Sequence, residues 1–145
     1  MLIPFNLSTT FDRSSDETEN ACVLRALLDC LIRCNVARIR YASRPLPRLY
    51  ESGVKYGRTI DWDNVTTLYK RGYGDCKSLT AALIAEYYLR GIDARPVFRH
   101  AKTLIGARNY HILVLVPKRN GLDKTEFEDP SRKLGMGQDE LKHFY

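Results

Sequence analysis

The sequence predicts an α+β fold in which helices precede an antiparallel sheet. Before Gly91 the apolar residues recur with a helical period, and the stretch 76–89 is so apolar that we expect it at the centre of the domain. After Gly91 the segments "ARPVFRH" and "NYHILVLVPK" are rich in branched and aromatic residues, as strands are. We therefore expect a central helix packed against a sheet formed by the last third of the chain.

Length and composition indicate one globular domain. The chain has 145 residues, of which 44% are apolar and 28% charged. The net charge is +6, but the basic residues are scattered and accompany no nucleic-acid motif. We expect no nucleic-acid partner, although a modest attraction to nucleic acid or an acidic protein stays open. The sequence has no apolar run of about 18 residues, so we expect no membrane span. The N-terminus lacks the features of a signal peptide, so we expect the protein in the cytoplasm or in a particle assembled in the cytoplasm.

The first elements follow from capping residues and apolar spacing. Residues 2–8 resemble a short strand or extended arm. The stretch 14–35 predicts the first helix, because acids crowd its first turn and leucines mark one face. Ser15 or Asp16 is the expected N-cap of this helix, and Asn35 is its expected end.

Proline and glycine mark the stretch 36–59, which predicts extended chain wrapping the domain. A short helix follows, with Asp61 or Asp63 as its cap and Gly72 at its end. The next helix covers 76–89.

Three strands are expected next, over 94–100, 109–118 and 125–129, the last ended by Pro130. Residues 137–145 suggest a closing helical turn. The helices therefore come before the strands in the chain.

Four cysteines occur: Cys22, Cys30, Cys34 and Cys76. A disulfide framework is not expected in a chain of this size without an export signal. Cys30 and Cys34 have a spacing that suits a metal, but no further cysteine or histidine lies nearby to complete a site. We expect these two as small core residues.

Cys76 is the candidate nucleophile. In "GYGDCKS" it stands at the first turn of a helix, where the helix dipole lowers a thiol pKa and free backbone N–H groups can stabilise an oxyanion. Gly72 and Gly74 are expected to permit a tight turn and the approach of a substrate. Position and access therefore favour a reactive thiol.

A thiol nucleophile needs a base and a group that orients the base. His111 stands near the start of a predicted strand, and Asp129 ends the following one. If these strands pair, the imidazole and the carboxylate can meet at one edge. His100 could take the place of His111, although it sits at a strand end, and we expect no chemical role for His143 near the terminus.

Three blocks, "RGYGDCKSLTAALIAEYYLRGIDARPVFRH", "YHILVLVP" and "EDPSRKLGM", resemble the transglutaminase-like superfamily, in particular its small bacterial and bacteriophage members. The resemblance covers about residues 50–137. It implies a papain-like core, in which a central helix presents Cys76 to an antiparallel sheet that carries His111 and Asp129. We therefore expect a single domain over 1–145, with the catalytic core in 51–137 and an arm and helix in 1–50, where the sequence shows no resemblance.

The resemblance implies thiol acyl transfer through Cys76, His111 and Asp129, and it implies that catalysis needs no metal or organic cofactor. Water as acceptor gives a cysteine peptidase or amidase acting on a protein or peptide, and an amine gives a cross-linking enzyme. Tyr56 is a candidate for an additional oxyanion donor. Trp62 is another, although packing under the short helix would also explain it. Lys77 departs from the acid that many relatives carry, and we expect it to add to thiolate stabilisation.

A second function remains open. Proteins similar to this one are often encoded among phage and prophage structural genes. The domain would then be a virion or assembly protein that binds phage structural proteins, with its triad active or vestigial. A third hypothesis is an inactive binding module of any origin.

Overall fold

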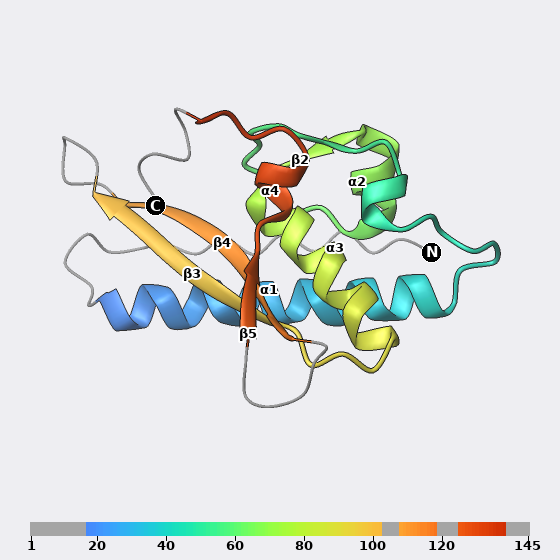
Figure 1. Cartoon of the computed structure of the whole chain (residues 1–145), viewed down its shortest axis with the longest axis horizontal. Coiled ribbons are helices and arrows are strands. Elements are labelled where there is room, and N and C mark those ends of the chain that lie inside the picture. Colours follow the sequence, from blue (N-terminus) through green and yellow to red (C-terminus); the bar gives the residue numbers. More distant parts are fainter. Residues whose placement is uncertain (1–16, 103–107, 119–124, 139–145) are drawn as a thin grey trace.

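The computed structural model describes residues 17–102, 108–118 and 125–138. It confirms a mixed α and β architecture, with helices preceding a three-stranded antiparallel sheet (Figure 1). The expected arm at 2–8, the caps Ser15 and Asp16, and nearly all of the closing turn lie outside the described residues.

Helix α1 (Glu17–Arg40) is longer than predicted. Asn35 does not end it: this side chain is buried, and its Oδ1 accepts a hydrogen bond of 2.7 Å from the backbone N–H of Val65. The predicted helix end at Asn35 is therefore wrong. Its side chain joins α1 to the start of α2, because its hydrogen-bond partner, Val65, is distant in the sequence.

The stretch after α1 is extended only in part. It holds the 3₁₀ turn η1 (Leu49–Glu51) and the short strand β1 (Lys55–Tyr56), which pairs in parallel with β2 (Tyr73–Gly74). This small sheet places the chain just before Cys76 beside residues 55 and 56.

Helix α2 (Val65–Arg71) begins at a different cap from those predicted. Asn64 Oδ1 accepts hydrogen bonds of 3.1 Å from the N–H groups of Thr66 and Thr67. Asp61 and Asp63 were the wrong candidates, since both carboxylates instead form ion pairs with Arg71. The predicted end at Gly72 is confirmed; its φ of 81° is the left-handed conformation that glycine adopts without strain.

Helix α3 (Cys76–Leu89) is the predicted central helix. All residues from Ser78 to Ala85 are buried, and the helix contacts α1, β4 and α4. Leu79, Leu83 and Ile84 contribute to the main hydrophobic core. The helix that carries Cys76 is therefore fixed from several sides.

The sheet has the order β3 (Arg95–Lys102), β4 (Arg108–Pro117) and β5 (Thr125–Glu128), and all pairs are antiparallel. Strand β5 ends with Glu128 opposite Val114. The earlier part of β4 has no strand neighbour on that side among the described residues, and the N-terminal turns of α3 lie there instead. Thr80 Oγ1 donates to the carbonyl oxygen of Ile112 at 3.2 Å.

Candidate active site

Cys76 is the first residue of α3, as the sequence predicts. It is half-buried and packs against a hydrophobic cluster that includes Leu28, Ala81 and Ile112. Its backbone N–H lies in the first turn of a 14-residue helix, where the first N–H groups have no partner within the helix.

The sulfur of Cys76 contacts the backbone of β4. Sγ lies 4.0 Å from the carbonyl oxygen of Tyr110, and the N–H of Ile112 donates a hydrogen bond to the sulfur. These two residues flank His111 in the sequence. The thiol is thus held against the open edge of β4, at the point where the histidine stands.

His111 and Asp129 are in direct contact. Nε2 of the imidazole lies 2.9 Å from Oδ2 of the carboxylate, and the two side chains are 1% and 8% exposed. The other carboxylate oxygen, Oδ1, accepts a hydrogen bond of 3.1 Å from the N–H of Arg132, so Asp129 is also the N-cap of helix α4 (Pro130–Lys133). The predicted strand over 125–129 therefore ends one residue earlier, at Glu128.

The electrostatic environment of Cys76 differs from the expectation. Burial, together with the smaller effect of the negative charge of Asp75, raises the pKa of the thiol to about 12. The hydrogen bond from Ile112 and the positive charge of Lys77 act in the opposite direction but do not compensate. The expectation of a thiolate stabilised by the helix dipole and Lys77 is therefore wrong for the resting protein, because desolvation dominates.

Lys77 is bound on both sides. Its Nζ donates to a carboxylate oxygen of Asp75 and, at 2.7 Å, to the carbonyl oxygen of Thr59. The same ammonium lies 5.9 Å from the centre of the Trp62 ring. Sequence reasoning missed this cluster, because residues 59 and 62 lie in a segment without periodic structure.

The segment 59–63 is tied to the helices around Cys76. Ser78 Oγ accepts a hydrogen bond of 3.0 Å from the N–H of Asp63, and Arg71 pairs with Asp61 at 2.7 Å. Trp62 packs against the same hydrophobic cluster as Cys76, whereas Tyr56 packs against the main core. Of the two candidate oxyanion donors, Trp62 is the one that shares a cluster with the thiol.

The two glycines before Cys76 have different roles. Gly72 supplies the turn after α2, as expected. Gly74 is buried in β2, and a Cβ placed there would lie 2.5 Å from Cδ1 of Leu68. Gly74 therefore permits close packing in the interior, and the expected opening for a substrate is wrong at this position.

The remaining candidates fall outside the site. His100 is exposed and pairs in register with Tyr110, whereas His111 pairs with Arg99, so the two histidines point to opposite faces of the sheet. His143 lies outside the described residues.

Of the other cysteines, Cys30 and Cys34 were expected in the core. Cys22, Cys30 and Cys34 are exposed instead, because they lie on the outer face of α1 while leucines occupy its inner face. In the described part of the chain, no group of three or more His, Cys, Asp or Glu side chains is arranged to hold a metal ion.

Comparison with known proteins gives no relative: no family model, no curated protein and no solved structure matches the chain. Across the residues that the structure covers, none of the helices has the length and apolar character needed to cross a membrane.

Proposed function

We propose that this protein is a cysteine hydrolase or acyltransferase with a papain-like, transglutaminase-like core, acting on an amide or peptide bond of a protein or peptide. Cys76 is the nucleophile, His111 carries the proton and Asp129 orients the imidazole. The observation that supports this most is the buried contact of His111 with Asp129, at the point of β4 where the sulfur of Cys76 touches the backbone.

The contact with Asp129 assigns roles to the two ring nitrogens. A carboxylate at Nε2 favours the tautomer with its proton on that nitrogen, which makes Nδ1 the base. Because Arg132 fixes the second carboxylate oxygen, Asp129 is held at both ends. The ring of His111 therefore has one preferred orientation.

The reaction proceeds in two transfers. As the sulfur of Cys76 bonds to the carbonyl carbon, Nδ1 takes the thiol proton and the carbonyl oxygen becomes an oxyanion. The N–H groups at the start of α3, and the indole N–H of Trp62, are the proposed donors to that oxygen. Collapse breaks the C–N bond, and the imidazolium returns its proton to the leaving amine. Water or a second amine then cleaves the thioester.

The raised pKa of Cys76 bears on the first step. At neutral pH the resting thiol is protonated, so proton removal by His111 accompanies attack. A substrate that displaces water and approaches the helix N-terminus supplies the compensating interactions.

The same pKa favours a second candidate function. A half-buried, protonated thiol is also what a vestigial site would retain in a virion or assembly protein that uses this fold to bind a partner.

Acetylation by p-nitrophenyl acetate distinguishes these two functions. The positions that become acetylated are read by peptide mapping, with the exposed Cys30 of the same chain as the internal reference. The enzyme predicts acetyl transfer to Cys76 that is lost in His111→Ala, while acetylation of Cys30 is unchanged. Equal acetylation of Cys76 with and without the imidazole would favour the binding module.

A further inference from the structure

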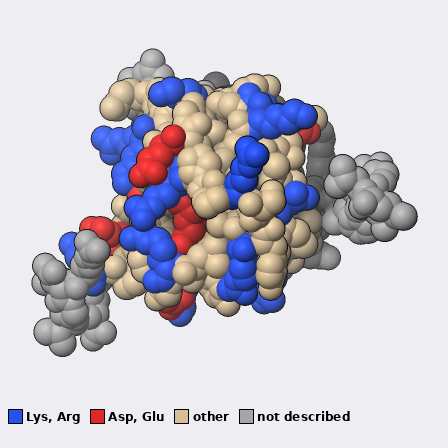
Figure 2. Space-filling view, turned by 90° about the vertical axis from the view of Figure 1, so that its right-hand side faces the viewer, with Lys and Arg blue, Asp and Glu red and all other residues tan. Residues whose placement is uncertain are grey.

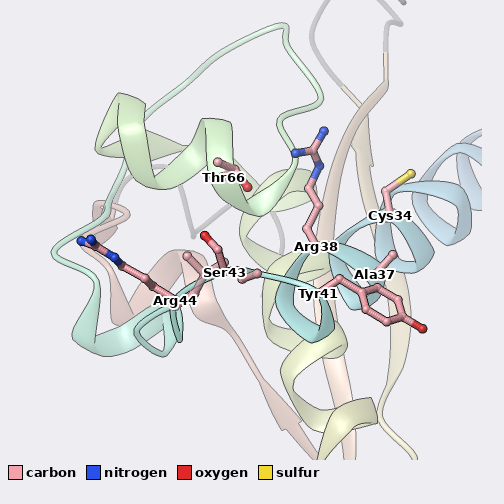
Figure 3. A pocket seen from close by; sticks show the side chains of 9 residues that line it. Cys34, Ala37, Arg38, Tyr41, Ser43, Arg44 and Thr66 are labelled. Carbon is pink, nitrogen blue, oxygen red and sulfur yellow. The ribbon is translucent and has the colours of Figure 1, made fainter. Parts of the chain in front are cut away.

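A groove of about 680 Å³ lies between the last turns of α1, the loop that follows and Thr66 of α2. Figure 3 shows Arg38 and Ala37 on α1, with Tyr41 directly after the helix, on one side of the view, and Arg44 extending from the loop on the other side. None of the catalytic candidates lines this groove.

The chain around the groove is basic. Residues 30–50 contain no Asp or Glu, and they contain five arginines, all exposed: Arg33, Arg38, Arg40, Arg44 and Arg48. Over the described ranges none of the five forms an ion pair, whereas Arg71 and Arg95 both do. Figure 2 views the end of the molecule where α1 stops, and Lys and Arg side chains are spread over that face.

The groove also has an apolar component. Tyr41 is 78% exposed, and Cys34 and Ala37 lie exposed on the same side of α1. Tyrosine and arginine, which meet here, are both enriched in the centre of protein interfaces.

Charge and apolarity together select the kind of occupant. A second copy of this chain would bring five more arginines to the same face, so repulsion disfavours self-association. A phosphate backbone pairs with arginine but gains nothing from Ala37 and Cys34. An acidic protein segment satisfies the arginines through its carboxylates and covers the apolar floor with one of its own side chains.

We propose that this groove is a docking site for an acidic segment of a partner protein, with carboxylates at Arg38 and Arg44 and an apolar side chain against Tyr41 and Ala37. The inference does not depend on the chemistry at Cys76. It concerns a surface that a substrate protein or an assembly partner would use equally well.

The test selects binders without assuming their sequence. A random dodecapeptide library is panned against the immobilised full chain, and enriched peptides are synthesised for fluorescence anisotropy. We expect sequences that combine Asp or Glu with a large apolar residue. Their affinity should fall by at least about tenfold in Arg38→Glu/Arg44→Glu. It should change little in the matched control Arg25→Glu/Arg90→Glu, which alters the net charge equally at exposed positions outside the groove.

A cysteine footprint gives a second readout. Bound peptide should slow alkylation of Cys34, which lines the groove, but not of Cys22 near the other end of α1. The proposal is overturned if no peptide binds saturably, if both double variants lose affinity equally, or if Cys34 is not protected. Tighter binding of oligothymidylate than of any peptide, lost only in Arg38→Glu/Arg44→Glu, would make the groove a nucleic-acid site instead.

Discussion

Nε2 of His111 lies 2.9 Å from Oδ2 of Asp129, and neither side chain has more than a tenth of its surface exposed. The contact joins β4 to the residue that directly follows β5, and the carboxylate also caps the helix that comes next. One residue therefore serves both the proposed chemistry and the local fold, and two substitutions at position 129 separate these roles.

Asp129→Asn preserves the cap, because asparagine caps helices as well as aspartate does. It removes the negative charge that selects the tautomer of His111, so we expect acyl transfer from Cys76 to fall by about three orders of magnitude or more with little change in thermal stability. Asp129→Ala should lose the cap as well, at about 1 kcal/mol of unfolding free energy. Rates are measured by p-nitrophenol release and stability by urea unfolding. An Asp129→Asn variant as active as the wild type would contradict the assigned role.

The thiol of Cys76 should show the pH dependence of a raised pKa. Because burial raises that pKa to about 12, the thiolate is scarce at pH 7 and increases about tenfold per pH unit across the alkaline range. Alkylation of Cys76 by iodoacetamide should therefore be slower than that of glutathione at pH 7 and should rise without a plateau up to pH 10. Peptide mapping separates Cys76 from the exposed cysteines. A plateau below pH 8 would show a preformed thiolate.

Glu128 anchors the strand that precedes Asp129. Its carboxylate accepts hydrogen bonds from Tyr50 at 2.8 Å and from Tyr87 and Lys133 at 2.5 Å. Burial raises the pKa of Glu128, but these three donors outweigh it, so the net shift is downward. A lowered pKa contributes stability that is present above the ordinary glutamate value and is lost as pH falls through the folded-state value.

We therefore expect Glu128→Gln to lower the unfolding free energy at pH 7 by about 1–3 kcal/mol and to flatten its decline in acid. Denaturant titrations between pH 3 and 7 measure both effects. Glu126→Gln is the matched control, since that side chain is exposed on the same strand. The interpretation fails if the two variants have the same pH dependence.

Gly74→Ala tests the close packing before Cys76. The added Cβ would lie 2.5 Å from Leu68, which is fully buried, so the core must shift and we expect a loss of about 1–3 kcal/mol. Gly137→Ala meets nothing within 4 Å and should change stability by less than about 0.5 kcal/mol. Urea unfolding compares the two variants; an equal effect would show that β2 adjusts freely.

Local pattern predicted much of the fold. The observed bounds of α3 agree with the predicted ones because the apolar run and the flanking glycines are local signals. The three strands lie close to their predicted positions because the composition of the chain changes abruptly after Gly91. The meeting of His111 and Asp129 was predictable because adjacent strands bring the ends of both to one edge of a sheet.

Interactions between distant residues were not predictable. Asn35 suggested a helix end because its partner, the N–H of Val65, belongs to another helix. Cys30 and Cys34 suggested the core by composition alone, whereas the leucines of α1 decide which face is buried. Burial and the charge of Asp75 raise the pKa of Cys76, whereas the sequence suggested a pKa lowered by the helix dipole. Burial could not be predicted because it depends on the whole packed structure.

The central claim is that the sulfur of Cys76 and the imidazole of His111 meet in one site. Reaction with 1,3-dibromoacetone tests this directly, because its three-carbon bridge joins a thiol only to a nucleophile next to it. Mass spectrometry of digested protein should show peptides containing Cys76 and His111 linked by that bridge, and no link in His111→Ala. A Cys76 adduct whose second arm has reacted only with water, or has joined a residue other than His111, would contradict the proposed site.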